Sequence, residues 1–534
     1  MSAARADLAR PAPRTGGNGA PGPAFRKVLV ANRGEIAIRV CRTLRAMEIP
    51  SVAVYSDADR GAPHVRTADE AVRIGPPAPS ESYLDMAAIL AAAKATGAEA
   101  IHPGYGFLSQ SAAFSRACAE SGVVFVGPSP ESMDRLGDKE SSRRAAVRCG
   151  VPVVPGAEDV PDATRAAKEA EAIGFPVLLK AAGGGGGRGM RRVATAGELP
   201  DAFESARREA LAAFGNGRIF VEKVIHPARH VEIQILGDGA RAIAIGEREC
   251  SLQRRYQKVI EESPSTAVTP KIRAAMERAA VALAEDAKYA GAATVEFLLG
   301  PDGSFYFLEV NTRLQVEHPV TEMRFGLDLV RAQIEIAAGG ALPGIPAPRG
   351  HAIEARLNAE DAYHGFLPQT GTLLVLDWPE AEGLRVDAGI AAGQTIHAHY
   401  DSLLAKVIAH GETREAARAR LAEALRGLAL LGVVTNQGFL LDLLDDDAFA
   451  RGETYTHSIE AREWPAPDGP PDEALLAAAV AYFLPRATRA GSRDDDDRYS
   501  PWRRLGPWGR PGAAPRDAAS APRAPSAPGA RGRS

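Results

Sequence analysis

The sequence has few cysteines and no long apolar segment. Its 534 residues include four cysteines and no Cys-x-x-Cys pair. That is too few for a disulfide framework or a cysteine-rich zinc site. No apolar run approaches the roughly 18 residues that a membrane-spanning helix needs. These absences indicate a reducing compartment, and we expect a cytoplasmic protein that has no membrane segment.

Charge of one sign is not concentrated in the chain. The 63 basic and 67 acidic residues leave a net charge of −4, and no long basic run precedes the C-terminal tail. Binding to a phosphate backbone requires a concentrated positive surface. Nucleic acid is therefore not expected as a partner, and the balance favours small-molecule chemistry. The length suggests about three domains.

The two ends of the chain differ in composition from the middle. Residues 1–24 are rich in Ala, Pro, Gly and Arg and lack the apolar core of a signal peptide. We interpret them as a disordered extension, with an organelle-targeting segment as the alternative because three arginines outnumber one aspartate. Beyond Trp464, a helix near 473–482 precedes a tail whose composition buries too little apolar surface to fold alone.

Short apolar runs alternate with helical segments from Arg26 onward. Strand-like runs such as KVLVA and SVAVYS are separated by helices expected near 35–47, 83–96 and 112–120. This alternation predicts a mostly parallel sheet that is covered on both faces. The turn Asn32–Glu35 after the first strand lacks Gly-x-Gly-x-x-Gly, so it indicates a structural turn and no dinucleotide site.

Five consecutive glycines, Gly183–Gly187, lie between two strand-like segments. A glycine run is usually a flexible linker. The flanking strands instead favour a hairpin lid whose bare N–H groups approach phosphate oxygens, with Arg188 adding charge. The run is not a Walker A loop, because Met190 stands where that motif has lysine. Lys180 is a candidate point-charge ligand for phosphate, whereas an isolated lysine such as Lys139 is normally a solvated charge.

A hairpin is predicted within ATVEFLLGPDGSFYFLEVNTRLQVEHPVTE, residues 293–322. Asp-Gly between two apolar runs is a strong hairpin signal because both turn positions tolerate positive φ. If Asp302 and Gly303 form a two-residue loop, Glu296 faces Glu309. Directly opposed Cβ atoms lie roughly 4.5–5.5 Å apart, and like charges there are destabilising unless something neutralises them. A divalent cation would do so.

The alternation continues beyond this pair of glutamates. Polar groups recur at every second position up to Glu317 while the chain stays extended. Carboxylates, an amide and a guanidinium on one face can hold a hard metal ion with an anion beside it. The alternative is a solvated strand face. The residues that share this face are Glu309, Asn311, Arg313, Gln315 and Glu317.

Other polar residues lie in strand patterns of their own. Glu222 and Lys223 in IFVEKVI, and His230 in RHVEIQIL, are either ligands or structural polar groups. The charged segment 247–263 has the composition of a solvated face, although it could donate hydrogen bonds to the same anion. Arg356, in HAIEARLNAE, could pair with a neighbouring acid or bind a ligand.

Nine segments occur in the order shown by one family. They are KVLVANRGEIAIRV, AIHPGYGFLSQ, GDK, LLKAAGGGGGRGM, RHVEIQIL, CSLQRRYQKVIEE, FLEVNTRLQVEHPVTE, GHAIEARLNAED and HYDSLLAKVI. Together they resemble biotin carboxylase, the ATP-grasp component of biotin-dependent carboxylases such as acetyl-, propionyl- and other acyl-CoA carboxylases. The resemblance covers about residues 25–463.

The resemblance implies a fold and domain limits. The expected class is α/β and α+β, with a Rossmann-like parallel sheet, an ATP-grasp domain with a mobile glycine-rich lid, and a C-terminal α+β domain. The expected ranges are 1–24 for the extension, 25–137 for the N-terminal domain, 138–345 for the ATP-grasp domain with its lid at about 155–225, 350–463 for the C-terminal domain, and 464–534 for a helix and tail. Further helices are expected near 327–338 and 414–428.

The resemblance also implies roles for single residues. ATP would be bound by Lys139, Lys180, Gly185, Gly186, Gly187, Arg188, Gly189, Met190, Glu222, Lys223, Val224, His230, Gln253, Tyr256, Glu296, Leu298 and Glu309. Magnesium or manganese would be held by Glu296, Glu309 and Asn311, and bicarbonate by Lys258, Arg313, Gln315 and Val316. Glu317 would be the catalytic base, with Lys258, Arg313 and Arg356 as catalytic partners. Biotin would contact Arg356 and Tyr83.

The sequence departs from the family pattern in two places, one of which concerns nucleotide contacts and the other the partners. Tyr256 stands where many members have histidine, which affects nucleotide contacts and not the reaction. No methionine follows Met323 and the chain has no Met-Lys-Met, the family's biotin attachment site. The resemblance therefore implies a separate biotin carboxyl carrier protein, a separate carboxyltransferase subunit and a homodimer. The alternatives are another ATP-grasp ligase and a non-catalytic nucleotide-binding subunit.

Overall fold

The computed structural model describes residues 25–181, 190–214, 217–467, 469 and 474–477. Residues up to Pro465 form one compact unit, and those from Ala466 form a second. All the architecture below belongs to the first unit, apart from the helical residues 474–477. Within the described residues, no helix is both long enough and apolar enough to span a membrane.

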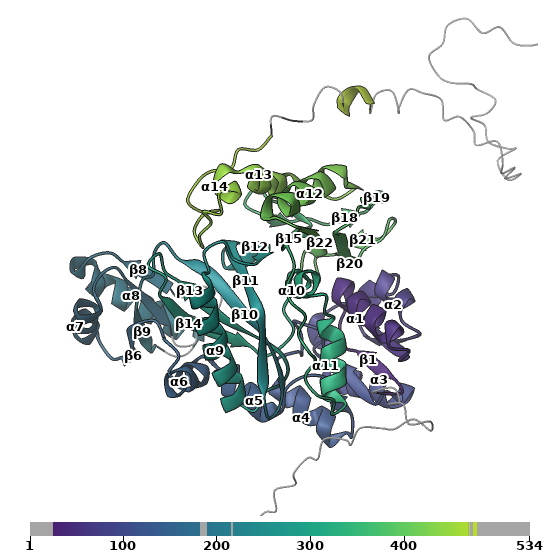
Figure 1. Ribbon diagram of the computed structural model, residues 1–534, viewed down its shortest axis with the longest axis horizontal. Helices are drawn as coiled ribbons and strands as arrows, with labels where there is room; N and C mark the ends of the chain where they lie inside the picture. Colours follow the sequence, from purple (N-terminus) through teal and green to yellow (C-terminus); the bar gives the residue numbers. More distant parts are fainter. Residues whose placement is uncertain (1–24, 182–189, 215–216, 468, 470–473, 478–534) are drawn as a thin grey trace, which may run out of the picture. The chain divides into compact units, whose positions relative to one another are not determined.

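A five-stranded parallel sheet forms the N-terminal part, coloured purple in Figure 1. Its strand order is β3-β2-β1-β4-β5. Val28 and Val30 pack towards helix α1, whereas Leu29 faces α3 and α4, so both faces are covered, as expected for a parallel sheet. The strands are β1 (Val28–Val30), β2 (Ser51–Ser56), β3 (Glu70–Gly75), β4 (Ala100–His102) and β5 (Val124–Phe125), and the helices are α1 (Gly34–Ala46), α2 (Pro63–Thr67), α3 (Met86–Thr96) and α4 (Ala112–Glu120).

The three helices predicted for this part are confirmed, with one shift. Helix α3 begins three residues later than expected because the Asp85 side chain accepts a hydrogen bond from the Ala88 N–H, which fixes the N-cap there. Two connecting helices follow, α5 (Pro130–Leu136) and α6 (Lys139–Arg148).

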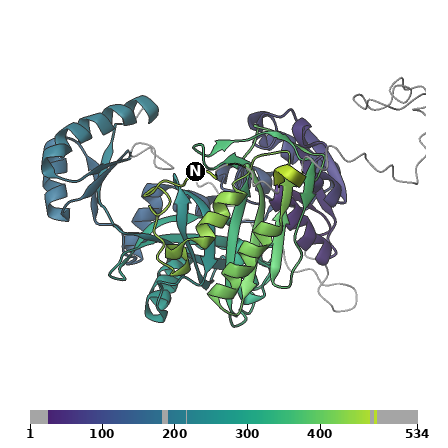
Figure 2. The same ribbon diagram turned by 90° about the horizontal axis from the view of Figure 1, so that it is seen from above.

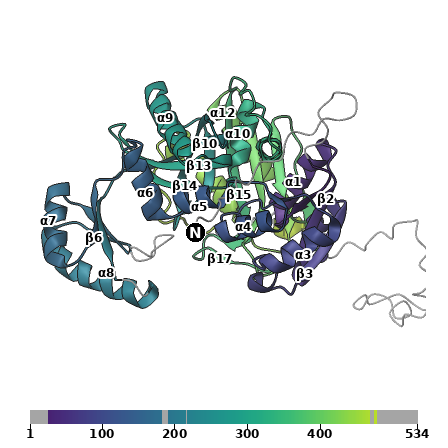
Figure 3. The ribbon, with the colours of Figure 1, turned by 90° about the horizontal axis from the view of Figure 1, so that it is seen from below.

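A small antiparallel sheet carries the residues on either side of the glycine run. Strands β7 and β8 pair antiparallel, so the predicted hairpin strands are confirmed; residues 182–189 between them lie outside the described chain. Helices α7 and α8 pack on each other and on this sheet, as Figures 2 and 3 show. The strand order is β6-β9-β7-β8, and the elements are β6 (Gly156–Val160), α7 (Ala163–Ile173), β7 (Val177–Ala181), β8 (Met190–Val193), α8 (Leu199–Phe214) and β9 (Ile219–Lys223).

An eight-stranded antiparallel sheet occupies the centre, in the order β14-β13-β10-β11-β12-β15-β22-β20. Strand β12 pairs with β15, so one hydrogen-bonded ladder crosses from the residues expected in the ATP-grasp domain to those expected in the C-terminal domain. Its strands are β10 (Arg229–Asp238), β11 (Ala242–Arg254), β12 (Gln257–Ser263), β13 (Ala290–Leu299), β14 (Phe305–Asn311), β15 (His351–Asn358), β20 (Leu384–Ala388) and β22 (Leu403–Gly411).

Helices pack on the central sheet both at its β13-β10-β11 strands and at its β15-β22 strands. Helix α9 (Pro270–Asp286) packs on β10 and β11, α10 (His318–Phe325) on β15, and α11 (Leu329–Ala337) on β13. The C-terminal part adds α12 (Arg414–Gly427), α13 (Gln437–Asp445), α14 (Asp447–Ala450) and three short antiparallel pairs, β16 (Glu360–Asp361) with β17 (Leu367–Pro368), β18 (Gly371–Thr372) with β21 (Thr395–Ile396), and β19 (Val375–Asp377) with β23 (Ala429–Leu431).

The helices predicted near 327–338 and 414–428 correspond to α11 and α12. The helix predicted near 473–482 is described only over residues 474–477, which are helical. The rest of that range lies outside the described chain.

The predicted hairpin forms between β13 and β14, but its turn differs from the prediction. Gly300 N–H donates to the Ser304 carbonyl (2.8 Å), so the loop has three residues and not two. Gly303 takes a φ of 80°, the left-handed position that such loops require. A bulge then follows, because Phe297 faces Phe307 while Glu296 faces Glu309. The bulge restores the predicted pairing of the two glutamates.

Gly237, on β10, lies against the backbone of a neighbouring turn. A Cβ added there would lie 2.2 Å from the Tyr289 carbonyl oxygen, and backbone atoms at that distance must shift. We therefore expect Gly237→Ala to destabilise the protein by about 1–3 kcal/mol, as overpacking does. A lowered thermal unfolding midpoint would show this. Gly344→Ala is the control, because nothing lies within 4 Å of its Cβ position; equal midpoints would contradict the prediction.

Candidate active site

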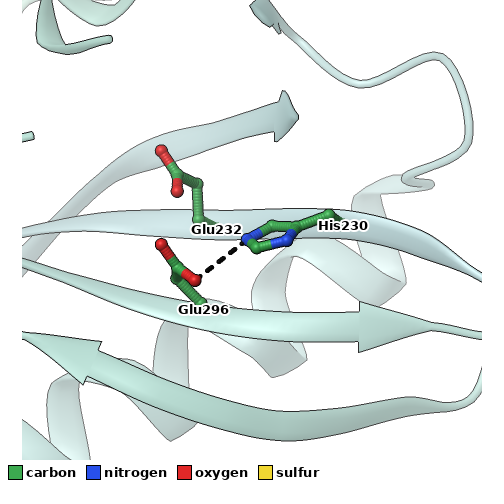
Figure 4. Close-up of side chains that lie close together, drawn as sticks. All are labelled: His230, Glu232 and Glu296. Carbon is green, nitrogen blue, oxygen red and sulfur yellow. Dashed lines mark ion pairs between the residues drawn. The ribbon is translucent and has the colours of Figure 1, made fainter. Parts of the chain in front are cut away.

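Three carboxylates stand side by side on one rung of the central sheet. Glu309 on β14 faces Glu296 on β13, which in turn faces Glu232 on β10. Figure 4 shows Glu232 and Glu296 next to each other with His230 beside them. Glu232 and Glu296 are buried, so water screens their repulsion little. The sheet therefore concentrates negative charge at one place.

Lys258, near the start of β12, lies against this rung. Its Nζ donates to Glu232 Oε2 (2.6 Å), Glu296 Oε1 (2.9 Å) and Glu317 Oε1 (2.6 Å). Burial alone would lower the pKa of Lys258, but the three carboxylates outweigh it and hold that pKa well above its usual value. The ammonium is therefore charged and fixed by three acceptors.

Arg248, on β11, faces Glu232 on β10 and extends the rung by one residue. Its guanidinium is fully buried and donates to Glu232 Oε1 (2.5 Å) and Gln234 Oε1 (2.6 Å). It also donates to the Thr294 and Thr321 hydroxyls. A planar guanidinium can satisfy four acceptors in this way, so Arg248 holds Glu232 in position from behind.

Glu296 and Glu309 have opposite pKa shifts. Burial would raise the pKa of Glu296, but Lys258 and His230, whose Nε2 lies 3.1 Å from Glu296 Oε2, hold it well below its usual range. Burial, and then the negative charge of Glu296, raise the pKa of Glu309. Glu309 is thus the carboxylate whose charge is least compensated.

The donor set around this pair fits a hard divalent cation. Asn311 and Gln315 both place their amides on Glu296 Oε1, at 2.9 and 3.0 Å. Carboxylate and amide oxygens are the ligands that Mg²⁺ and Mn²⁺ prefer. A cation between Glu296 and Glu309 would neutralise the charge that raises the pKa of Glu309, so the predicted metal residues are suited to the ion.

The polar residues after β14 converge as the alternation predicted, although the strand itself ends at Asn311. Arg313 donates to Asn311 Oδ1 (3.1 Å), Gln315 Oε1 (2.8 Å) and Gln110 Oε1 (2.9 Å). The guanidinium is therefore fixed beside the carboxylate rung. It leaves an electropositive position next to the candidate metal ligands.

Glu317 lies at the N-terminus of α10 between two cations. Its Oε1 accepts from Lys258 and its Oε2 from Arg356 (3.0 Å). Burial would raise the pKa of Glu317, but Lys258, Arg356 and Arg248 hold it well below the usual value. Arg356, on β15, is fixed in turn by Glu261 Oε1 on β12 (2.6 Å from Nε). Glu317 is thus ionised, and both of its carboxylate oxygens are held by cations.

Several other predicted residues lie near the small sheet and the β11–β12 turn. Lys180 pairs with the Glu222 carboxylate. Lys223 Nζ donates to the Gly174 carbonyl (2.8 Å). Gln253 faces Lys258 across the hairpin, and Tyr256 is 59% exposed at its tip.

The remaining predicted ligands have the following places. Lys139 is the first residue of α6, Met190 faces Lys180 across β7 and β8, Val224 N–H donates to the Pro176 carbonyl (3.1 Å), and Leu298 faces His230 across β13 and β10. The Val316 carbonyl accepts a hydrogen bond from Lys406 Nζ (2.8 Å). The five predicted positions Gly185–Gly189 lie outside the described residues.

Tyr83 is not part of this cluster. Its ring is fully buried in the N-terminal part, stacked on Phe107 at a centroid distance of 5.1 Å. Its hydroxyl donates to Asp59 Oδ2 (2.7 Å). The ring has no exposed surface in this structure, and its contact with biotin stays a prediction.

Sequence reasoning missed Glu232, Arg248 and Glu261. Glu232 is two residues from His230 in RHVEIQIL, so the period-two pattern of a strand could have placed both on one face. Arg248 and Glu261 lie in the charged segment 247–263, where bulges interrupt the pairing of β11 with β12 and obscure the alternation.

Three protein-family models match the chain in succession. They are the biotin carboxylase N-terminal domain at residues 24–133, the ATP-binding domain of the carbamoyl-phosphate synthase L chain at 138–345, and the biotin carboxylase C-terminal domain at 354–461. The glutamate rung and Lys258 lie within the second match, and Arg356 lies within the third.

Curated relatives and solved structures agree with these matches. A mitochondrial methylcrotonoyl-CoA carboxylase subunit alpha from rice is 51% identical over 82% of this chain and 60% of its own length. The chain thus spans about three fifths of that relative. A biotin carboxylase from Nostoc sp. is 46% identical over 82% of this chain and 99% of its own length.

Two solved structures have the same fold. A biotin carboxylase–β-γ-ATP complex from Campylobacter jejuni is 41% identical, with a TM-score of 0.78, over 82% of this chain and 99% of the other. The biotin carboxylase domain dimer of Hydrogenobacter thermophilus 2-oxoglutarate carboxylase, solved with MgADP and bicarbonate, is 43% identical, with a TM-score of 0.76, over 82% and 97%. Three adjoining domain matches and a relative matched along nearly its whole length show that this chain belongs to the biotin carboxylase family.

Proposed function

We propose that the chain uses ATP to carboxylate biotin that a separate carrier protein presents, with bicarbonate as the source of the carboxyl group. The observation that carries this proposal is the position of Glu317. Its ionised carboxylate lies between Lys258 and Arg356 and beside the paired Glu296 and Glu309. A base, an anion site and a metal site are thus adjacent.

Bicarbonate is a poor electrophile, and the anion site is where it would be activated. Lys258 and Arg313 supply positive charge, and Gln315 and the Val316 backbone supply hydrogen bonds to its oxygens. Glu317 accepts the bicarbonate proton as a bicarbonate oxygen attacks the γ-phosphorus of ATP. The new O–P bond forms as the bond between the γ-phosphorus and the β–γ bridging oxygen breaks, which releases ADP and gives carboxyphosphate. Fixed donors favour this transfer because they align reactants and stabilise developing charge.

Glu296, Glu309 and Asn311 would hold Mg²⁺ or Mn²⁺. When bound, the ion supplies positive charge to the phosphate oxygens of the nucleotide. The proposed nucleotide residues Lys180 and Glu222 belong to the small sheet that carries the glycine run. Exclusion of water by such a segment protects an unstable acyl phosphate. The other proposed ATP contacts are Lys139, Gly185–Gly189, Met190, Lys223, Val224, His230, Gln253, Tyr256 and Leu298.

Arg356 would face the ureido group of biotin and stabilise the negative charge that develops there. Its guanidinium is pre-oriented by Glu261 and Glu317. The names of the α-subunit relatives support a carrier protein and a carboxyltransferase subunit as partners, and the dimer of the Hydrogenobacter domain supports a homodimer. Four cysteines without a disulfide among the described residues support a cytoplasmic location.

The proposed reaction is tested with the purified chain, ATP, Mg²⁺ and bicarbonate. Phosphate release should require bicarbonate and should rise when free biotin or a biotinylated carrier is added. Stimulation by ammonia or an amine instead of biotin would assign the chain to another class of ATP-grasp ligase. Binding of ATP with no bicarbonate-dependent release would identify a non-catalytic subunit.

Glu317→Gln should abolish proton acceptance while keeping the shape of the side chain. We expect turnover to fall by about 10²–10⁴-fold, the usual contribution of a positioned base. The dissociation constant of Mg-ATP, measured by calorimetry, should stay close to that of the wild type, because Glu317 pairs with Lys258 and Arg356 and not with the proposed nucleotide residues. Lost nucleotide affinity with normal turnover would contradict the assignment.

Glu309→Gln should weaken the metal site. One of two carboxylate ligands loses its charge, so we expect the Mg²⁺ concentration for half-maximal activity to rise about tenfold or more. Titration of activity with Mg²⁺ at saturating ATP measures this. The exposed Glu382→Gln serves as the matched control, and a Glu309→Gln enzyme with the Mg²⁺ dependence of that control would refute the proposed ligand.

A further inference from the structure

A second pair of opposed glutamates lies behind Arg356. Glu261 on β12 directly faces Glu354 on β15, and neither side chain is exposed to solvent. Opposed residues in an antiparallel pair bring their Cβ atoms to roughly 4.5–5.5 Å. Two ionised carboxylates at that separation, away from water, repel strongly.

The two carboxyls are bonded very differently. Glu261 Oε1 accepts from Arg356, at 2.6 Å from Nε and 2.5 Å from an Nη atom. Within the part of the chain that the structure describes, Glu261 Oε2 and both oxygens of Glu354 have no hydrogen-bond partner. Three buried carboxyl oxygens thus remain without a donor on the face that carries Arg356.

Another opposed pair in the same sheet shows that this is unusual. Glu249 faces Glu262 across β11 and β12. Arg229 and Ser265 donate to Glu249, and Arg414 donates to both oxygens of Glu262. Cations and hydroxyls donate hydrogen bonds to that pair, whereas none of the described side chains donates one to Glu354.

The groups that face Glu354 come from every neighbouring element. Lys406 on β22, Glu261 on β12 and Arg356 on the same strand act on Glu354, as does Glu317, which precedes His318 at the start of α10. Lys406 Nζ is engaged by the Val316 carbonyl (2.8 Å) and Glu35 Oε1 (3.2 Å). His318 is neutral because burial and nearby cations lower its pKa. Ile408, on β22, faces Glu354 and belongs to an apolar cluster with Val320 and Ala352.

This environment favours the neutral acid. Burial, followed by the charge of Glu261, raises the pKa of Glu354 well above its usual value even though Lys406 opposes the shift. Burial also raises the pKa of Glu261 to about 7, against the opposing charge of Arg356. A carboxylic acid is a donor as well as an acceptor, and one shared proton would satisfy two of the unpartnered oxygens.

We propose that Glu354 is a positioning residue that stays protonated and donates a hydrogen bond to Glu261 Oε2, so that Glu261 keeps its other oxygen on Arg356. The inference rests on the proposed role of Arg356 towards biotin. The shared proton limits the negative charge behind the guanidinium to one. Arg356 then retains positive charge for the ureido group, and the position of its plane is fixed.

Deprotonation of Glu354 should lower activity towards biotin. As pH rises and Glu354 loses its proton, a second negative charge opposes Glu261 and disturbs Arg356. Wild-type kcat/KM for biotin should therefore fall on the alkaline side. Glu354→Gln keeps a donor and cannot ionise, so it should retain activity at neutral pH and lose that alkaline decline. An unchanged alkaline decline in Glu354→Gln would overturn the proposal.

Glu354→Leu removes the donor while remaining apolar. We expect kcat/KM for biotin to fall about tenfold or more, in line with one hydrogen bond to a charged group, while KM for ATP stays unchanged. The exposed Glu423→Gln is the control. Equal losses in both KM values would mean a general structural role and would contradict the inference.

Stability gives an independent readout, because the Gln side chain is close in shape to the acid. An acid with a raised folded pKa loses stability as pH rises from its unfolded to its folded pKa. Between about pH 5 and 8, where model carboxyls are ionised, the thermal unfolding midpoint of Glu354→Gln should therefore rise relative to that of the wild type as pH increases. A carboxylic-acid carbonyl band at neutral pH, seen by infrared difference between the two proteins, should accompany this. A constant midpoint difference with no such band would refute the shared proton.

The failure of this inference and that of the proposed function are distinguishable. A wild-type protein that biotin does not stimulate would disprove the function. A stimulated wild type whose pH profile matches that of Glu354→Gln would disprove only the role of Glu354.

Discussion

A single ammonium group, that of Lys258, holds together three carboxylates from three different parts of the chain. Glu232, Glu296 and Glu317 all lie within 3 Å of its Nζ. Breaking a buried ion pair by removing one partner costs about 3–5 kcal/mol, and here one partner serves three acids. The site and the stability of the central sheet therefore depend on the same contact.

Strand β12 extends this constraint to the second half of the site. Lys258 lies near its start and Glu261, which holds Arg356, lies three residues later on the same strand. Because β12 is hydrogen-bonded to β11 on one side and β15 on the other, Lys258 and Arg356 are held by one continuous ladder. The small sheet with the glycine run is a separate ladder, so it can move without altering the spacing of Lys258 and Arg356.

Much of this arrangement could be predicted from sequence, because alternation along a strand decides which side chains share a face. The facing of Glu296 and Glu309 was predicted correctly from a turn assigned one residue too short, since the bulge after Phe307 compensates. The opposition of Glu354 to Glu261 was not predicted, because no local signal pairs strands that lie ninety residues apart. The burial of the Tyr83 ring was not predicted either, because sequence pattern does not show that a ring is packed on all sides.

The bulge between Phe307 and Glu309 divides the hairpin into two independent registers. Residues near the tip follow the three-residue loop, whereas Glu309 and Asn311 follow their partners deep in the sheet. Changes of length at the tip are thereby insulated from the carboxylates, since slippage there can be absorbed before it reaches them. The hairpin thus tolerates changes of register at its exposed tip, while the end that carries Glu309 and Asn311 keeps its pairing.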